Sequence, residues 1–320
     1  MVAVVAAGAI NWDVNLFVGE FPRPGEETPV IRITRVPGGK AGNVAVAAAR
    51  LLGSGKVGIM GALGTDEISG TQLQLLNSEG VDTSAISRKA DAESGQAYIV
   101  TDQSGENLIH THFGANAILK PEDILQKSSH EMIQSARVTA ITDPPEEVIE
   151  TITRIAHAAG RLIAWDPGIR AKLGMNRLRD ILLRTDYLLL NEVEVEYMTG
   201  VSDPAEAAKR LSALKSDLTA ILKSGSEGCT MFTGKTSTRA QGIDLSKYGM
   251  SVVNTVGCGD AFLGAFSAAK ALGLTDEEAL RWANWAGALK ATKAETRGSP
   301  TRKELDKWIS ATSTTVVAHN

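Results

Sequence analysis

Short apolar runs rich in β-branched residues alternate with segments of helical periodicity along most of this chain, and this rhythm limits the folds open to it. The runs lie at residues 2–7, 56–60, 138–141, 162–165, 187–190 and 219–222. Between and after them, apolar residues recur at helical spacing, as in Val44, Ala47, Ala48 and Leu51. Strands that alternate with helices form parallel sheets covered by helices. The sequence therefore predicts an α/β fold with a central, mostly parallel sheet flanked by helices.

Two segments break the rhythm and predict a small second sheet. Residues 28–36 alternate between apolar and polar at period two. Residues 95–113 contain two strand-like runs on either side of the turn residues 102–106. Antiparallel strands inserted in an α/β chain indicate a small sheet beside the main one.

Composition excludes several classes of function. The chain has 33 Lys and Arg against 37 Asp and Glu, a net charge of −4, so nothing attracts it globally to nucleic acid or to an acidic membrane. The apolar stretch from Met1 to Ile10 is too short to span a bilayer and lacks the features of a signal peptide. Cys229 and Cys258 are too few for a disulfide framework. We expect a cytoplasmic protein without nucleic-acid or membrane partners.

The strongest local pattern is the glycine-rich turn from Asn254 to Asp260, which directly precedes an amphipathic helical segment. Gly257 and Gly259 let the backbone turn tightly and approach a ligand. We therefore expect the free N–H groups of the first helical turn to form an anion site. Asp260 has two interpretations. It could be the N-cap of the helix, or a base beside a transferred phosphoryl group. The spacing alone leaves both open.

Two loops nearer the N-terminus carry polar side chains suited to a hydroxylated ligand. The turn from Pro37 to Asn43 opens a helix and places Lys40 and Asn43 where glycines allow close approach, although it could also be only a close-packed turn. After the first strand, Asn11 and Asp13 lie two residues apart, so an extended backbone would aim both side chains the same way. An Asx-turn is the alternative.

In this order, these loops resemble the ribokinase-like (PfkB) family of carbohydrate kinases, from Ala7 to about Leu305. The C-terminal signature of the family is similar to Asn254–Asp260 and its helix, and the N-terminal signature is similar to Gly38–Leu52. The resemblance implies an α/β fold with a small β-sheet lid that covers the sugar. It also implies a homodimer formed through the lid.

The resemblance places the whole of residues 1–320 in one domain, with the lid formed by about 14–36 and 95–113. It also assigns roles to individual residues. Asp260 would take a proton from the sugar hydroxyl, beside an anion hole formed by Gly257, Cys258 and Gly259. The sugar-side residues would be Asn11, Asp13, Gly38, Gly39, Lys40 and Asn43. ATP would be bound by Asn191, Lys223, Gly225, Gly228 and Asn284, and Mg²⁺ would be organised by Glu194.

Three departures from the family pattern bear on function. The first signature residue is Asn254, where ribokinases carry an aspartate that coordinates an activating monovalent cation, so we expect weak dependence on potassium. Lys223 replaces the more usual Thr or Ser and would add a contact to phosphate. Residues 165–170 look more like the matching segment of fructokinases and ketodeoxygluconate kinases.

The sequence therefore predicts an ATP-dependent phosphotransferase that phosphorylates a sugar hydroxyl, with a pentose as the favoured acceptor. A nucleoside kinase of the same family is the nearest alternative, and a fructokinase or ketodeoxygluconate kinase is another. A sugar-binding regulator without catalysis is the alternative from a different class. Such a protein has no reason to keep Asp260, Glu194 and the anion-hole glycines together.

Overall fold

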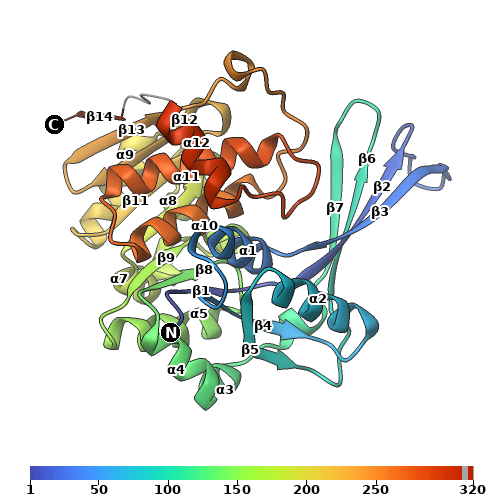
Figure 1. Cartoon of the computed structure of the whole chain (residues 1–320), viewed down its shortest axis with the longest axis horizontal. Helices are drawn as coiled ribbons and strands as arrows, with labels where there is room; N and C mark the ends of the chain where they lie inside the picture. The colour runs from blue at the N-terminus through green and yellow to red at the C-terminus, as the bar shows by residue number, and fades with distance from the viewer. Residues whose placement is uncertain (312–315, 320) are drawn as a thin grey trace.

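The computed structural model describes residues 1–311 and 316–319, and in that part of the chain the strands form two separate sheets (Figure 1). The larger sheet has ten strands, in the order β14 (Val316–His319), β13 (Thr236–Gln241), β12 (Gly228–Thr233), β11 (Thr219–Lys223), β10 (Tyr187–Asn191), β9 (Leu162–Trp165), β8 (Val138–Ile141), β1 (Val4–Ala7), β4 (Val57–Leu63) and β5 (Val81–Arg88). Every neighbouring pair from β11 to β5 is parallel. The strands β12, β13 and β14 add an antiparallel edge. The predicted α/β class with a mostly parallel central sheet is confirmed.

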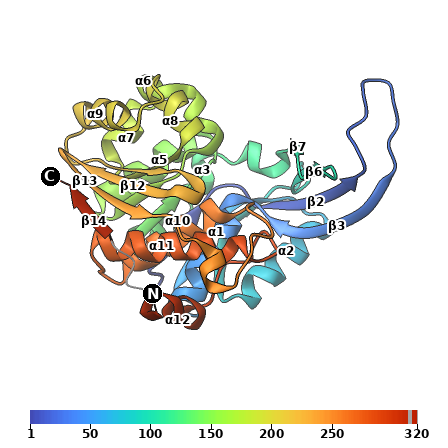
Figure 2. The same ribbon diagram turned by 90° about the horizontal axis from the view of Figure 1, so that it is seen from above.

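Helices cover both faces of the larger sheet (Figure 2). One face carries α1 (Lys40–Leu52), α2 (Glu67–Ser78), α10 (Cys258–Ala271), α11 (Asp276–Ala291) and α12 (Arg302–Ala311). The other face carries α3 (Pro121–Ile124), α4 (Lys127–Ser135), α5 (Glu146–Ala158), α6 (Gly174–Arg177), α7 (Arg179–Arg184), α8 (Glu192–Thr199) and α9 (Pro204–Leu214). Within the described residues, none of these helices has the length and apolar character needed to cross a membrane.

The alternation of side chains along each strand explains the unbroken apolar runs. In β1, Val4 and Ala6 join the core on the α1 face, and Val5 and Ala7 join the core on the α5 face. All four are buried. A strand covered on both faces needs apolar residues at every position, which is the pattern seen in the sequence.

The smaller sheet, here called the lid sheet, consists of β3 (Val30–Gly38), β2 (Asn11–Val18), β6 (Gly95–Thr101) and β7 (Asn107–His112), in that order. The hairpins β2–β3 and β6–β7 are antiparallel, and β2 joins them by pairing in parallel with β6. The lid sheet extends from the body of the molecule as an arm (Figure 2). It contains the strands expected within residues 28–36 and 95–113. The expected lid begins at about residue 14, whereas the lid sheet begins at Asn11.

Apolar runs do not predict β5, β12 or β13. The strand β5 alternates buried and partly exposed residues, and β13 is mostly polar with only Ala240 buried. These strands lie at or near the edges of the sheet, where helices cover them less completely. Their sequences therefore lack the continuous apolar character of the central strands.

Close packing of α1 against α10 brings two of the predicted ligand loops together. A Cβ atom at Gly264 in α10 would lie 2.6 Å from the Cβ of Ala47 and 2.7 Å from the carbonyl oxygen of Val44, both in α1. Only glycine allows the two backbones to approach so closely. Each helix begins at one of the glycine-rich loops, so the contact sets the distance between those loops.

We expect Gly264→Val to lower the free energy of unfolding by about 1 to 3 kcal/mol, because the added side chain would overpack this contact. The matched control is Gly70→Ala in α2, where a Cβ would meet no atom within 4 Å. Alanine there should raise stability by up to about 1 kcal/mol, because it is a better helix former than glycine. Urea denaturation measures both. Equal stability of Gly264→Val and the unmodified protein would contradict the close helix contact.

Candidate active site

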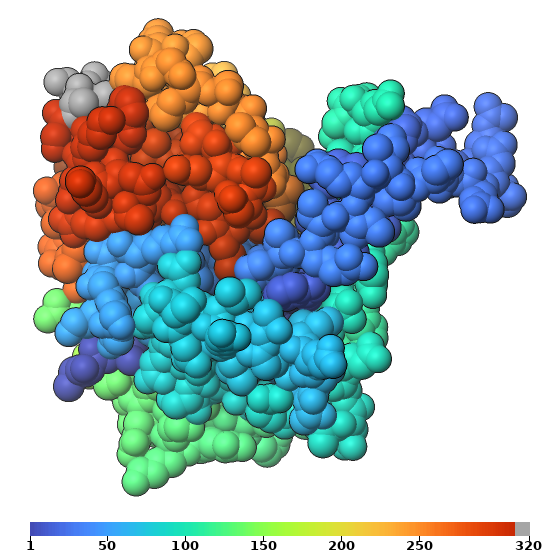
Figure 3. All heavy atoms as spheres, turned by 45° about the vertical axis from the view of Figure 1, so that its right-hand side comes forward, coloured from blue at the N-terminus to red at the C-terminus, as the bar shows by residue number. Residues whose placement is uncertain are grey.

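The carboxyl ends of β1, β8, β9, β10 and β11 face one cavity of about 710 Å³, which the lid sheet borders on the other side. Figure 3 shows the hollow between the projecting arm and the body of the molecule. Parallel strands end at the same edge of a sheet, and open α/β folds bind ligands at that edge. Every predicted site residue except Gly38 lines this cavity.

Gly38 lies behind the side chain of Asp13. A Cβ at Gly38 would lie 2.2 Å from the Asp13 carboxylate, and the Gly38 carbonyl accepts a hydrogen bond of 2.7 Å from Nη2 of Arg297. Gly38 therefore makes room for Asp13 and does not itself face the cavity.

Asn11 and Asp13 lie on β2 and both line the cavity. Asn11 pairs with residues on both neighbouring strands, which contradicts the Asx-turn interpretation. Its Oδ1 accepts a hydrogen bond of 2.9 Å from Nδ2 of Asn116. Asp13 is 5% exposed, and burial raises its pKa to about 7 although the nearby Arg297 opposes the rise.

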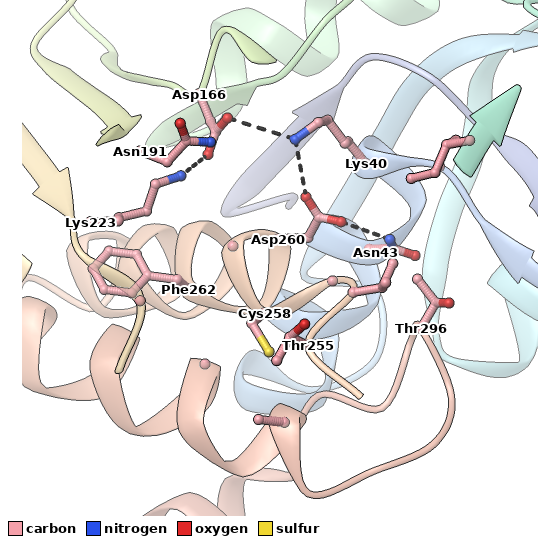
Figure 4. Close-up of a pocket in the computed structure, with 18 of the residues that line it drawn as sticks. Lys40, Asn43, Asp166, Asn191, Lys223, Thr255, Cys258, Asp260, Phe262 and Thr296 are labelled. Carbon is pink, nitrogen blue, oxygen red and sulfur yellow. Dashed lines mark hydrogen bonds and ion pairs between the residues drawn. The ribbon is translucent and has the colours of Figure 1, made fainter. Parts of the chain in front are cut away.

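Asn43 and Lys40 connect α1 to Asp260 (Figure 4). Nδ2 of Asn43 donates a hydrogen bond of 2.7 Å to Oδ2 of Asp260, and Oδ1 of Asn43 accepts one of 3.3 Å from Nε of Arg297. The arginine thereby orients the amide so that its NH₂ group faces the carboxylate. The ammonium nitrogen of Lys40 lies 3.9 Å from Oδ1 of Asp260.

Asp260 is the third residue of α10 and not its N-cap, so the N-cap interpretation is wrong. The N-cap is Gly257, at φ 87°, and it has no side chain to cap the helix. The carboxylate of Asp260 turns toward α1. Burial raises the pKa of Asp260, and Lys40 and Asn43 oppose the rise. In the described part of the chain, Oδ1 of Asp260 accepts no hydrogen bond, which leaves it available to take a proton.

The start of α10 presents free backbone N–H groups to the cavity. The N–H groups of Gly257, Gly259 and Asp260 have no acceptor among residues 1–311 and 316–319. That of Cys258 donates to the carbonyl oxygen of Thr255 at 3.1 Å, so it is engaged within the loop. The predicted anion hole therefore draws on the other amides of this turn. Burial raises the pKa of the Cys258 thiol to about 11.

Opposite charges alternate from Lys223 through Asp166 and Lys40 to Asp260 (Figure 4). Lys223, at the end of β11, pairs with Oδ2 of Asp166, and Lys40 lies 3.8 Å from its Oδ1. Although burial favours the neutral acid, Lys223 and Lys40 hold the pKa of Asp166 below its usual range. Burial alone would lower the pKa of Lys40, but Asp166 and Asp260 outweigh it and raise that pKa.

Asp166 was not among the predicted site residues. It directly follows the predicted strand 162–165, so its position at the carboxyl end of a buried strand was an available signal. Asp143 lies two residues beyond the end of β8 and also lines the cavity.

Asn191 and Glu194 cap α8 reciprocally. Oδ1 of Asn191 accepts from the Glu194 N–H at 2.9 Å, and Oε2 of Glu194 accepts from the Asn191 N–H at 2.9 Å. Burial and the neighbouring Asp166 raise the pKa of Glu194. Its Oε1 makes no hydrogen bond within the described chain, and neither does the buried Oδ1 of Asp166.

These two carboxylates suit Mg²⁺. The ion is commonly held by one or two carboxylates together with substrate phosphates and water, not by a complete protein cage. In the part of the chain that the structure describes, no group of three or more His, Cys, Asp or Glu side chains could hold a metal ion.

The opposite end of the cavity is apolar enough to take a planar base. Phe262, Ile243, Leu245 and Ala288 line it. Asn284 of α11 lies at this end and donates a hydrogen bond of 2.8 Å to the carbonyl oxygen of Gln241. Gly225 and Gly228 also line the cavity. The cavity thus combines an apolar group of residues around Phe262, a row of charges, and a polar group around Asp13 and Asn43. Apolar residues of the lid region, Ile99, Ile109 and Phe113, also line it.

Comparison with known proteins gives one consistent result. Residues 1–303 match the model of the pfkB family carbohydrate kinases. The chain is 30% identical to an ATP-dependent ribose-1-phosphate kinase of Halopiger xanaduensis, over 97% of this chain and 99% of the relative. It is also 30% identical to a ribokinase of Haemophilus influenzae, over 94% and 96%. A solved structure of Arabidopsis thaliana ribokinase complexed with ribose and ATP superposes with a TM-score of 0.84 at 25% identity, over 96% of this chain and 98% of that one.

We expect Lys40→Met to move the acid limb of the pH–rate profile to higher pH by about one to three units. The reason is that a carboxylate takes up a proton only in its ionised form, and the Lys40 cation favours the ionised form of Asp260. Without that cation the pKa of Asp260 rises further. The measurement is kcat/KM between pH 5 and 9, with Lys209→Met on the exposed face of α9 as control. An acid limb that stays in place in Lys40→Met would remove Asp260 or its pairing with Lys40 from the mechanism.

Proposed function

Because the chain belongs to the pfkB family of carbohydrate kinases and is an ATP-dependent sugar phosphotransferase, we propose that its acceptor is a free pentose of the ribose type. The observation that carries this proposal is the group of polar side chains beneath the lid sheet. Asn11, Asp13, Lys40 and Asn43 line one end of the cavity beside Asp260. They offer several hydrogen-bonding groups to a small polyol within reach of one carboxylate.

The charge balance at this end favours an uncharged acceptor. Asp13 and Asp260 are carboxylates, and Lys40 is already shared between Asp260 and Asp166. Arg297 is buried behind Asp13 and does not line the cavity. A phosphate group on the sugar would lie near two carboxylates. Among the described residues that line this end, no cation is free to pair with it. This supports free ribose over ribose 1-phosphate, the substrate named for one relative.

In the proposed reaction, the acceptor hydroxyl lies against Oδ1 of Asp260. Its oxygen forms a bond to the γ-phosphorus of ATP as the bond from that phosphorus to the β,γ-bridging oxygen breaks, and ADP leaves. The hydroxyl proton passes to Asp260. The free amides of Gly257 and Gly259 donate hydrogen bonds to the transferred group, whose charge they stabilise. Most of the rate enhancement then comes from positioning and electrostatics.

On the nucleotide side, we assign the adenine to the apolar end of the cavity and the phosphates to the region of Lys223. The Lys223 ammonium lies 3.7 Å from where a Cβ of Gly259 would be, so it borders the anion turn. Glu194 and Asp166 would hold Mg²⁺, which when bound neutralises part of the phosphate charge. Asn191 fixes Glu194 through the reciprocal cap of α8.

An acceptor panel tests the proposal. The rate of ADP formation would be measured with ribose, ribose 1-phosphate, fructose, ketodeoxygluconate, adenosine, inosine and cytidine. We expect kcat/KM for ribose to exceed the others by at least about tenfold. In Asp260→Asn, kcat should fall at least about 10²-fold, which excludes a contaminating kinase. A higher kcat/KM for a nucleoside or for ribose 1-phosphate would reassign the substrate.

We also propose that two copies of this chain join through their lid sheets. Exposed apolar side chains gather on one face of this sheet, namely Ile31 and Ile33 of β3 and Leu108 of β7, whereas the neighbouring Ile109 faces the cavity. A second copy of the sheet would cover them, since large exposed apolar patches usually mark contact surfaces. Sedimentation analysis should give a dimer that Ile31→Lys with Leu108→Lys converts to a monomer, whereas Leu125→Lys on the body should leave it intact. A monomeric unmodified protein would refute this.

A further inference from the structure

Lys290, in the last turn of α11, is a lysine with no exposed surface. It does not line the cavity, and the sequence assigns it no role. Its ammonium group donates one hydrogen bond, of 2.9 Å, to the carbonyl oxygen of Asn254. A buried ammonium is costly unless polar or charged groups compensate for its lost hydration. An apolar side chain would fill the same space without that cost, so the position needs another explanation.

The acceptor of Lys290 belongs to the loop that leads into the anion turn. This loop is tied to the end of α11 by other bonds as well. The N–H groups of Val253 and Asn254 both donate to the carbonyl of Ala291, at 2.8 and 3.0 Å. The side chain of Asn254 donates to the carbonyl of Ala294 at 2.8 Å and accepts from the Val256 N–H at 2.9 Å. The hydrogen bond from Lys290 to the backbone carbonyl of Asn254 is a further connection between this loop and α11.

The charge of Lys290 interacts electrostatically with residues of the anion turn. Burial lowers the pKa of Lys290, and the opposing effects of Cys258, Glu295 and Asp260 only partly offset it. A phosphate bound at that turn would favour the charged lysine further. Of the three N–H donors of an ammonium group, the described residues accept only one.

We propose that Lys290 supports the anion turn in two ways. Its hydrogen bond holds the loop at Asn254 in its phosphate-binding form, and its ammonium group adds positive charge near the free amides. This rests on the proposed function only in taking the γ-phosphate of ATP as the anion. Lys290 is thus a positioning residue. It acts through the backbone of residues 254–260 and does not touch the substrate.

The first test is nucleotide affinity without any sugar, measured by titration calorimetry on Lys290→Met, whose side chain has similar shape and no charge. We expect ATP to bind at least about fivefold more weakly and ADP nearly unchanged, since only ATP carries the γ-phosphate. Lys293→Met is the matched control, because that neighbouring lysine is half-exposed and pairs with Glu304 at 3.2 Å. Equal losses for ATP and ADP, or no loss, would overturn the proposal.

The second test is turnover of the same variants with ribose, in sodium, ammonium and tetramethylammonium chloride at constant ionic strength. In Lys290→Met, kcat should fall at least about tenfold with the KM for ribose nearly unchanged, and ammonium should restore part of the rate by occupying the space left beside the Asn254 carbonyl. A lower kcat that ammonium does not restore would mean that Lys290 only stabilises the fold. If the unmodified protein phosphorylates no acceptor, the proposed function fails, whereas the calorimetric test of Lys290 still stands.

Discussion

The contact between α1 and α10 sets the geometry on which the rest of the site depends. Gly264 lets the two helix backbones touch, and both helices begin at glycine-rich turns that open on the cavity. As a result Asn43 of α1 reaches Asp260 of α10, although the two residues are 217 positions apart in sequence. Because protein interiors are tightly packed, this contact holds the carboxylate at a constant distance from the polar groups of the other helix.

Charge is unevenly distributed along the cavity, so its two ends suit different ligands. Beneath the lid sheet, the carboxylates of Asp13 and Asp260 are buried, and burial raises the pKa of each. At the end that we assign to the nucleotide lie Lys223, the free amides of the anion turn and, on the other side of the loop, Lys290. A neutral polyol is suited to the first region and a polyphosphate to the second. Lys40 lies between the two, and its loss would leave Asp166 and Asp260 without a shared counter-charge.

Local signals predict most of the central sheet, the lid strands β3, β6 and β7, and the site loops, but not the lid strand β2. Fully covered strands such as β1 are apolar throughout, whereas β5 and β13 are not and were missed. The sequence leaves the role of Asp260 open, because the N-cap and base interpretations differ only in where the helix begins. Sequence patterns do not fix the first residue of a helix to within a few positions. Asp166, Arg297 and Lys290 were missed for a different reason. Their importance comes from burial and from partners far away in sequence, which no spacing reveals.

The cysteine in the anion turn has a consequence for the chemistry of oxidation. Thiols at helix N-termini are often ionised and therefore reactive toward peroxides and alkylating agents. For Cys258, burial outweighs this effect and raises the pKa to about 11. At neutral pH the thiol form of Cys258 therefore predominates. The anion turn thus contains a sulfur atom that packs like a small apolar group, and its thiol is a poor target for oxidants that react with thiolates.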